Sequence, residues 1–193
     1  NDIQNDKIVC ARLYAGQHLS SWRKGSDGKS SYSGYISQGG GVLRDLSHVL
    51  DLMVWLFGDC VNVSAIGGKY TDVTIDSDDS FSLLCSTHNV PAVTINVNYL
   101  DRIGRRSIEV IGEKNTYILD LIENNYFRNK ELISSSVIER NDTYKTMHKR
   151  ALENDFQDHC SWNDALKVMS IIDSAELSSQ ENFKTINIGK DNV

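Results

Sequence analysis

An aspartate, a histidine and a second aspartate follow one another at three-residue intervals, at Asp45, His48 and Asp51. They lie in the segment GGGVLRDLSHVLDLMVWLFG, which spans residues 39–58. Residues three positions apart share one face of an α-helix. A carboxylate within hydrogen-bonding reach of an imidazole fixes its tautomer and favours its protonated form. This spacing indicates a general acid/base at His48 that Asp45 orients, and a helix cap with a buried polar pair is the alternative. Asp51 is expected to be structural.

The same segment predicts a single helix that positions these side chains. Three glycines, at residues 39–41, precede the helix, and without Cβ atoms they would let the backbone approach a ligand closely. Gly58 is expected to end the helix. The apolar residues recur with helical spacing and predict a buried stripe, formed by Leu46, Val49, Leu50, Met53, Val54 and Phe57.

Strands dominate the rest of the chain. Alternating or apolar stretches predict them at residues 7–14, 60–70, 79–87, 92–100, 106–111, 116–121 and 126–138. Two helices are expected near the C-terminal end, and the first of these should face the core with Tyr144, Met147, Ala151 and Leu152. The order predicts an α+β fold, with an open, mainly antiparallel sheet and helices packed on one face, as one domain over residues 1–193.

Composition excludes several classes of partner. The net charge is −6 and no basic stripe is present, so nucleic acid is not an expected partner. No apolar run approaches the roughly 20 residues of a membrane span, and the polar start NDIQNDK is not a signal peptide. The four cysteines are far apart and form no CxxC pair. They are typical of reduced thiols in a cytoplasmic protein.

A long polar stretch before the glycines mixes aromatic side chains, hydroxyls and an arginine, which suits the faces and hydroxyls of a sugar. Docking against another domain or subunit is an equally favoured interpretation. Three arginines at positions 102, 105 and 106 could pair with a phosphate or carboxylate, although a charge cluster at the sheet edge is favoured. A metal site built from Asp45, His48 and His18 or His88 has no support in the spacing. The predicted substrate-binding residues are Tyr14, Gln17, Trp22, Arg23, Tyr32 and Arg102.

The segment from Gly39 to Gly58 resembles the start of the C-terminal domain of the Gfo/Idh/MocA (glucose–fructose oxidoreductase / inositol dehydrogenase) family. Members commonly carry a glycine run, an aspartate, a histidine, a second aspartate and a Trp-Leu-x-Gly ending, here residues 55–58. Residues 7–14 and 108–116 and the last helix are also similar to this domain. In the family three residues usually separate the aspartate from the histidine, whereas only Leu46 and Ser47 do so here. The form RDLSH resembles a branch associated with nucleotide-sugar and acylated amino-sugar metabolism.

This resemblance implies an NAD(P)-dependent oxidoreductase that acts on a sugar, nucleotide sugar or polyol, with Asp45 and His48 as its catalytic pair. NAD or NADP would be bound mainly by an N-terminal Rossmann domain, and the family's glycine fingerprint and Lys-Pro are not found in this sequence. The chain is therefore expected to be the C-terminal domain alone, inactive by itself and without cofactor-binding or metal residues. The resemblance also implies a carbohydrate substrate and a homodimer or tetramer formed through the open sheet.

Two other classes of protein compete with this hypothesis. One is a non-catalytic sugar-binding or dimerisation module on the same scaffold, which would bind a sugar or dimerise without further domains. The other is a metal-dependent hydrolase or lyase, which would contain a bound metal. The residues alone do not choose among the three, and the resemblance favours the oxidoreductase.

Overall fold

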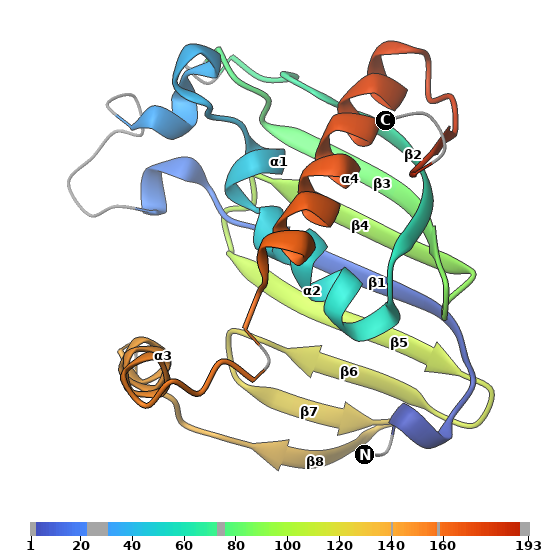
Figure 1. Cartoon of the computed structure of the whole chain (residues 1–193), viewed down its shortest axis with the longest axis vertical. Helices are drawn as coiled ribbons and strands as arrows, with labels where there is room; N and C mark the ends of the chain where they lie inside the picture. The colour runs from blue at the N-terminus through green and yellow to red at the C-terminus, as the bar shows by residue number, and fades with distance from the viewer. Residues whose placement is uncertain (1–2, 23–30, 73–75, 140, 158, 190–193) are drawn as a thin grey trace.

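The structure is a computed structural model that describes residues 3–22, 31–72, 76–139, 141–157 and 159–189. Nine strands form one sheet in the order β8-β7-β6-β5-β1-β4-β3-β2-β9, and helices cover one of its faces (Figure 1). The strands are β1 Ile8–Gly16, β2 Cys60–Gly68, β3 Ser80–Thr87, β4 Ala92–Asn98, β5 Arg105–Gly112, β6 Thr116–Asp120, β7 Asn125–Arg128, β8 Glu131–Ser135 and β9 Ile186–Asn187.

The described helices are short except for the last. They are α1 Val42–Asp45, α2 Ser47–Phe57, α3 Asp142–Leu152 and α4 Trp162–Gln180, with 3-10 turns at Ile3–Asn5, Leu19–Ser21, Tyr32–Gly34 and Ile36–Gln38. Among the described strands only β1 and β4 pair in parallel, and every other pairing is antiparallel. The predicted α+β architecture, a mainly antiparallel open sheet with helices on one face, is confirmed.

The core lies between the sheet and the pair formed by α2 and α4. In β4 the side chains of Val93, Ile95 and Val97 are buried, while Thr94 between them is exposed on the other face. This alternation follows from the two-residue period of a strand. The apolar stripe of α2 meets the same core, and each of the six residues predicted for it is buried. The buried residues of β4 and of α2 thus determine which face of the sheet the helices cover.

The helix predicted after the glycines is broken at Leu46. This residue has φ −99° and ψ 20°, so α1 ends at Asp45 and α2 begins at Ser47. The Val49 N–H donates to the Leu46 carbonyl at 2.9 Å, three residues back, which tightens the turn between the two helices. Asp45 and His48 therefore lie on different helices, and the expectation of one continuous helical face is wrong.

Two of the three glycines, Gly40 and Gly41, are required for close packing. At Gly41, φ is +131° and a Cβ atom would lie 2.2 Å from Oδ1 of Asp78. The same carboxylate accepts the Leu43 N–H through Oδ2 at 3.1 Å, and the Asp78 carbonyl accepts the Val42 N–H. Asp78 thus satisfies the first amides of α1, which only a glycine at position 41 allows it to approach.

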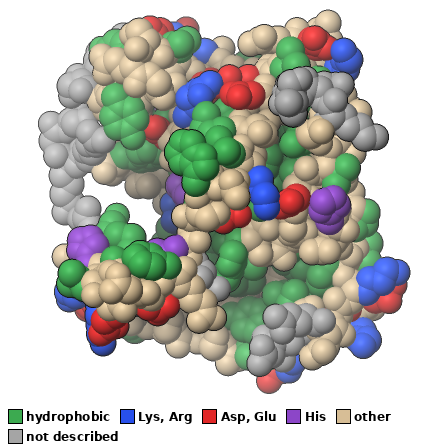
Figure 2. Space-filling model, in the orientation of Figure 1, with side chains coloured by type: hydrophobic (Ala, Val, Ile, Leu, Met, Phe, Trp, Pro, Cys, Tyr) green, Lys and Arg blue, Asp and Glu red, His purple; other side chains and the backbone are tan. Residues whose placement is uncertain are grey.

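The two C-terminal helices differ in burial. A capping box begins α4, since the Ser161 hydroxyl and the Asp164 carboxylate each bond the other's backbone. In contrast, no residue of α3 is buried, and Figure 2 shows this region as a separate lobe at lower left. The prediction that α3 faces the core is wrong for all four of its named residues, Tyr144, Met147, Ala151 and Leu152. The helix lies at the margin of the sheet, away from α2 and α4 (Figure 1).

The described residues include no helix that is both long and apolar enough to cross a membrane. All four cysteines are free; Cys60 and Cys85 are buried, Cys10 is half-buried and Cys160 is exposed.

A candidate active site between the α1–α2 junction and the β4–β5 turn

A cavity of about 810 Å³ lies where the α1–α2 junction faces the end of β1 and the start of β5. It brings together four of the predicted site residues, and these are Asp45, His48, Gln17 and Trp22. Further lining residues come from the β4–β5 turn, from β5, from the β6–β7 turn and from α3, and they include Ile103, Gly104, Arg105, Arg106, Ile122 and Tyr144. The three glycines before α1 do not line it. The site is thus built from five separate segments of the chain.

His48 is held by an arginine from the facing strand. Nη2 of Arg106 lies 2.8 Å from Nε2 of His48. A guanidinium only donates hydrogen bonds, so Nε2 accepts this one and the imidazole is neutral, with its hydrogen assigned to Nδ1. The ring also bonds the Asp45 backbone. His48 is solvent-accessible at the cavity wall, and its lone pair is occupied by Arg106.

The surroundings of His48 favour its neutral form. Partial burial of the ring, followed by the positive charge of Arg106, lowers the pKa of His48. The hydrogen bond with the Asp45 backbone and the negative charge of Asp51 oppose this effect but are smaller. The expectation that the Asp45 carboxylate favours protonated His48 is therefore wrong. The break at Leu46 explains the difference, because Asp45 meets the ring through its backbone.

The Asp45 carboxylate has a different partner, in the core. Tyr99 donates its hydroxyl to Oδ2 of Asp45 at 2.7 Å. Its ring is 1% exposed and meets Trp22 edge to face, with 5.1 Å between ring centroids. Burial first, and then the hydrogen bond and charge of Asp45, raise the pKa of Tyr99, so the phenol stays protonated as the donor. Tyr99 lies within the strand predicted at residues 92–100, but no partner was predicted for it; a partner could have been sought, because a buried phenol requires one.

A polar network holds the opposite wall of the cavity. Asp101 accepts from Nε of Arg105 and from the Tyr14 hydroxyl, each at 2.7 Å, and from the Ile103 N–H at 2.9 Å. These bonds, that of Tyr14 first, lower the pKa of Asp101 to about 2. Asp101 thereby balances the charge of Arg105. Arg106 has no acidic partner among the residues that the structure describes.

The other predicted substrate-binding residues lie outside this cavity. Tyr14 faces the uncovered side of the sheet, because its neighbours Leu13 and Ala15 face the core. Tyr32 is 48% exposed on a 3-10 turn, and Arg102 is exposed beside the cavity without lining it. Arg23 is outside the described residues. Tyr144 was not predicted to line a site, and for Arg106 a charge cluster at the sheet edge was favoured over a contact with an anion, whereas both line the cavity.

A second cavity, of about 520 Å³, adjoins the first and shares His48 with it. Asp51 lines it together with Cys160. Burial, and then the nearby Asp51 charge, raises the pKa of the Cys160 thiol, so the thiol stays protonated. Within the described ranges no group of three or more His, Cys, Asp or Glu side chains is placed to hold a metal ion.

Comparison with known protein families shows to which family this chain belongs. The family described as "GFO/IDH/MocA C-terminal domain" matches residues 7–118, more than half of the chain. The chain belongs to the GFO/IDH/MocA family of oxidoreductases and contains its C-terminal domain. A search of curated proteins finds no match.

Three solved structures show how far the similarity of fold extends. A levoglucosan dehydrogenase in complex with NADH and levoglucosan superposes with a TM-score of 0.80 at 15% identity, over 95% of this chain and 59% of that one. An NAD binding oxidoreductase from Klebsiella pneumoniae gives 0.80 at 16% identity, over 98% and 62%. The WlbA dehydrogenase from Bordetella pertussis, in complex with NADH and UDP-GlcNAcA, gives 0.71 at 17%, over 98% and 58%. The chain thus spans about three-fifths of the length of these proteins.

The described residues fit a site for a polyhydroxylated ligand and do not fit a dinucleotide site. A dinucleotide site needs a strand, a glycine-rich turn and a helix whose first amides face the pyrophosphate. Among the described residues, β1 leads into a 3-10 turn, and the carboxylate of Asp78 lies against Gly41 and occupies the first amides of α1. The cavity beside His48 instead offers an imidazole, a carboxylate and an aromatic ring, a set that fits a polyhydroxylated ligand.

Proposed function

We propose that this chain is the substrate-binding and acid/base domain of an NAD(P)-dependent oxidoreductase that acts on a sugar, nucleotide sugar or polyol. The observation that carries the proposal is the neutral His48, which lies in the cavity beside Asp45 in a chain of this family. The dinucleotide would be bound by an N-terminal Rossmann domain of the same protein. The structural neighbours support this assignment, because several were crystallised with NADH.

His48 would act as the general base in alcohol oxidation. A neutral imidazole can accept a proton, and a pKa below the usual value keeps His48 neutral at pH 7. The substrate hydroxyl would give its proton to Nε2 while its carbon becomes a carbonyl. The hydrogen bond to the Asp45 backbone and the negative charge of Asp51, which both favour the protonated ring, would stabilise the imidazolium that forms. The nicotinamide supplies the hydride acceptor when bound. In the reducing direction His48 would return the proton.

Carbohydrate recognition would come from side chains around the same cavity. The Trp22 ring offers an apolar face, the Gln17 amide offers a donor and an acceptor, and the Tyr144 hydroxyl lies across from them. Sugars present such alternating apolar faces and hydroxyls. The ligands named with the neighbouring structures, levoglucosan, L-sorbose and UDP-GlcNAcA, support this class of substrate.

Substitution of His48 tests the proposed role in the protein that includes the dinucleotide-binding domain. In His48→Gln, kcat is expected to fall by roughly 10²- to 10⁴-fold, the usual contribution of general acid–base catalysis. The measurement is NADH formation with a panel of sugars and polyols. His148→Gln, which changes an exposed histidine on α3, is the control and should leave kcat unchanged. Turnover by His48→Gln at the wild-type rate, with circular dichroism unchanged, would exclude His48 as the base.

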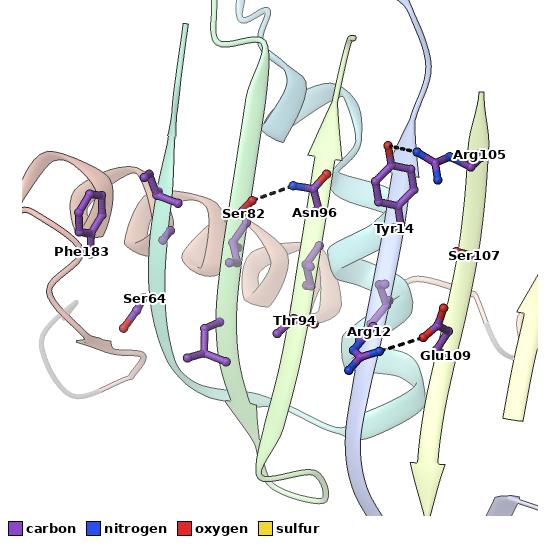
Figure 3. Close-up of a pocket in the computed structure, with 16 residues that line it drawn as sticks. Arg12, Tyr14, Ser64, Ser82, Thr94, Asn96, Arg105, Ser107, Glu109 and Phe183 are labelled. Atoms are coloured by element: carbon purple, nitrogen blue, oxygen red, sulfur yellow. Dashed lines mark hydrogen bonds and ion pairs between the residues drawn. The ribbon is translucent and has the colours of Figure 1, made fainter. Parts of the chain in front are cut away.

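The uncovered face of the sheet supports self-association. Figure 3 shows a groove across β2, β3, β4, β1 and β5, with a volume of about 620 Å³. Its polar side chains bond one another, as Arg12 does with Glu109 and Asn96 with Ser82. Two apolar side chains, Ile66 and Leu84, are about half exposed there. A face without unpaired charges is suited to a homodimer or tetramer.

Sedimentation velocity on the chain tests this surface. We expect a dimer or larger species, and Leu84→Asp should convert it to monomer because a carboxylate would be buried at the interface. Leu152→Asp, on exposed α3, introduces the same charge elsewhere and should leave the oligomer intact. A monomeric wild-type chain, or a Leu84→Asp variant that remains oligomeric, would contradict the proposed interface.

A cytoplasmic location completes the proposal. The buried cysteines Cys60 and Cys85 are both free although they lie on neighbouring strands, and thiols of this kind persist in reducing compartments.

A further inference from the structure

The proposed base cannot work while Arg106 holds it. Nε2 is the ring nitrogen that must accept the substrate proton, and in the structure it accepts a hydrogen bond from Arg106 at 2.8 Å. A guanidinium does not deprotonate and cannot pass a proton on. Turnover through His48 therefore requires that Arg106 leave Nε2 when substrate binds.

The two neighbouring arginines of β5 differ in the way their charge is balanced. Arg105 pairs with Asp101 at 2.7 Å and lies over the Tyr14 ring, 4.8 Å from its centroid. Arg106 lines the same cavity, but its only side-chain partner in the described part of the chain is a neutral imidazole. A guanidinium beside a cavity without a carboxylate partner is available to an anion, which it can bind through two parallel hydrogen bonds.

We propose that Arg106 binds an anionic group of the substrate, a carboxylate or a phosphate carried by the sugar, and that this binding draws Arg106 away from Nε2 of His48 and so frees the base. The inference rests on the proposed function and adds a substrate class to it. A neutral sugar has no group that competes with the imidazole for Arg106. Arg106 would thus determine specificity by controlling the base.

Other charged and titratable groups surround His48, and none takes the place of Arg106. Asp45 is bonded to Tyr99, and Arg105 is bonded to Asp101. His48 lines both cavities, and other titratable residues line them too. They are Asp51, Asp59, Tyr144, His159, Cys160, Asp164 and Lys167. Lys167 pairs with Asp59 at 2.8 Å. Among the described residues, Arg106 is therefore the cation that contacts His48 directly.

The test uses this chain and three related sugars, D-glucuronate, D-glucose 6-phosphate and uncharged D-glucose. NMR follows the imidazole signals during pH and ligand titrations, and His48→Gln identifies those of His48. In the wild-type chain the anionic sugars should bind at least roughly tenfold more tightly than glucose, as expected for a charge-assisted contact. They should also raise the pKa of His48, because the positive charge moves away from the ring.

Two variants distinguish the effect of the Arg106–His48 contact from the effect of a positive charge near the cavity. Arg106→Gln should raise the His48 pKa without ligand and bind all three sugars with similar affinity. Arg102→Gln removes the same charge from the adjoining turn, where the side chain neither lines the cavity nor touches His48, and should keep the wild-type preference. A preference for glucuronate alone identifies a carboxylate, and one for glucose 6-phosphate alone identifies a phosphate; either supports the inference.

Three results would overturn the inference. They are equal affinities of the wild-type chain for charged and neutral sugars, a preference that survives Arg106→Gln, and binding of an anionic sugar that leaves the His48 titration unchanged. Failure of the proposed function is a separate result. The proposed function would fail if the protein that includes the dinucleotide-binding domain turned over no sugar. This result could occur even if the chain bound anionic sugars more tightly through Arg106.

Discussion

The two walls of the cavity are held in place by different forces. The wall with Asp45 and His48 belongs to α1 and α2, whose apolar side chains are buried against the sheet. The wall with Arg105 and Arg106 follows the β4–β5 turn, where the carboxylate of Asp101 joins three donors. Packing fixes the first wall and a polar network fixes the second. This difference suggests that the chemistry depends on the core, whereas recognition depends on a turn that can vary without disturbing it.

The largest expected effect comes from the packed wall, at the glycine before α1. In Gly41→Ala the new Cβ would lie 2.2 Å from Oδ1 of Asp78, at a φ of +131°. The free energy of unfolding should fall by about 3 kcal/mol or more, as measured by urea denaturation. Gly39→Ala is the matched control: its φ is +78°, but no atom lies within 4 Å of the added Cβ. It should cost only about 1 kcal/mol. Equal losses in the two variants would contradict the packing role of Gly41.

The polar wall should respond less to substitution. Asp101→Asn keeps the shape of the side chain but removes the charge that Tyr14 and Arg105 bond, and should cost about 2 kcal/mol at pH 7. The folded pKa of Asp101 is about 2 and its ordinary value is 3.8. The stabilisation is therefore complete above about pH 4 and is lost as pH falls towards 2. The difference between variant and wild type in urea midpoint should shrink over that range.

A surface carboxylate provides the control for Asp101. Glu113 pairs with Lys7 at 2.8 Å, but both side chains are more than half exposed. Glu113→Gln should change stability by less than about 0.5 kcal/mol. If Asp101→Asn were as mild as this, the turn would not depend on its polar network.

Tyr99→Phe should destabilise the protein less than Asp101→Asn, and it separates the two functions of Tyr99, in packing and in bonding. Tyr99→Phe keeps the buried ring and removes the hydroxyl that Asp45 accepts, at a cost of about 1 kcal/mol. Tyr117→Phe is matched, because Tyr117 is equally buried and donates to Asp6 at 3.0 Å near the start of β1, whereas the cavity lies at the end of that strand. Both should lower the thermal midpoint alike, and only Tyr99→Phe should shift the NMR signals of His48. Identical spectra around His48 in both variants would show that Tyr99 does not position the site.

Local periodicity explains what could be predicted from the sequence. The stripe of α2 and the alternation of β4 are set by neighbouring residues, and burial follows directly from each. The alternation of β1 could also have shown that Tyr14 faces away from the helices. The apolar face of α3 was a weaker guide, because amphipathicity does not reveal whether another element covers that face.

The contacts of the site depend on register and backbone detail that the sequence does not reveal. Among the three arginines, the antiparallel register of β5 with β1 decides that Arg106 lies opposite Ala15 and reaches His48. The break at Leu46 decides that Asp45 turns its carboxylate to Tyr99. Neither contact follows from residue type or spacing. Asp45 and His48 line one cavity, but their bonding differs from the expected one, and their role as a catalytic pair stays a prediction.

The position of β1 has a consequence for the order of folding. This strand lies between β4 and β5, and it is the one described link between two sets of neighbouring strands, β2–β4 with β9 and β5–β8. Cys10 pairs with Ala92 and Ala11 with Val110, so each set can form hairpins early, while the joining strand must close loops of roughly 80 to 100 residues. During synthesis β1 stays unpaired until β4 has left the ribosome, and its second neighbour, β5, follows later. Before then, the unpaired β1 must be kept from pairing with other strands or other chains. This protection is a requirement for making the protein in a cell.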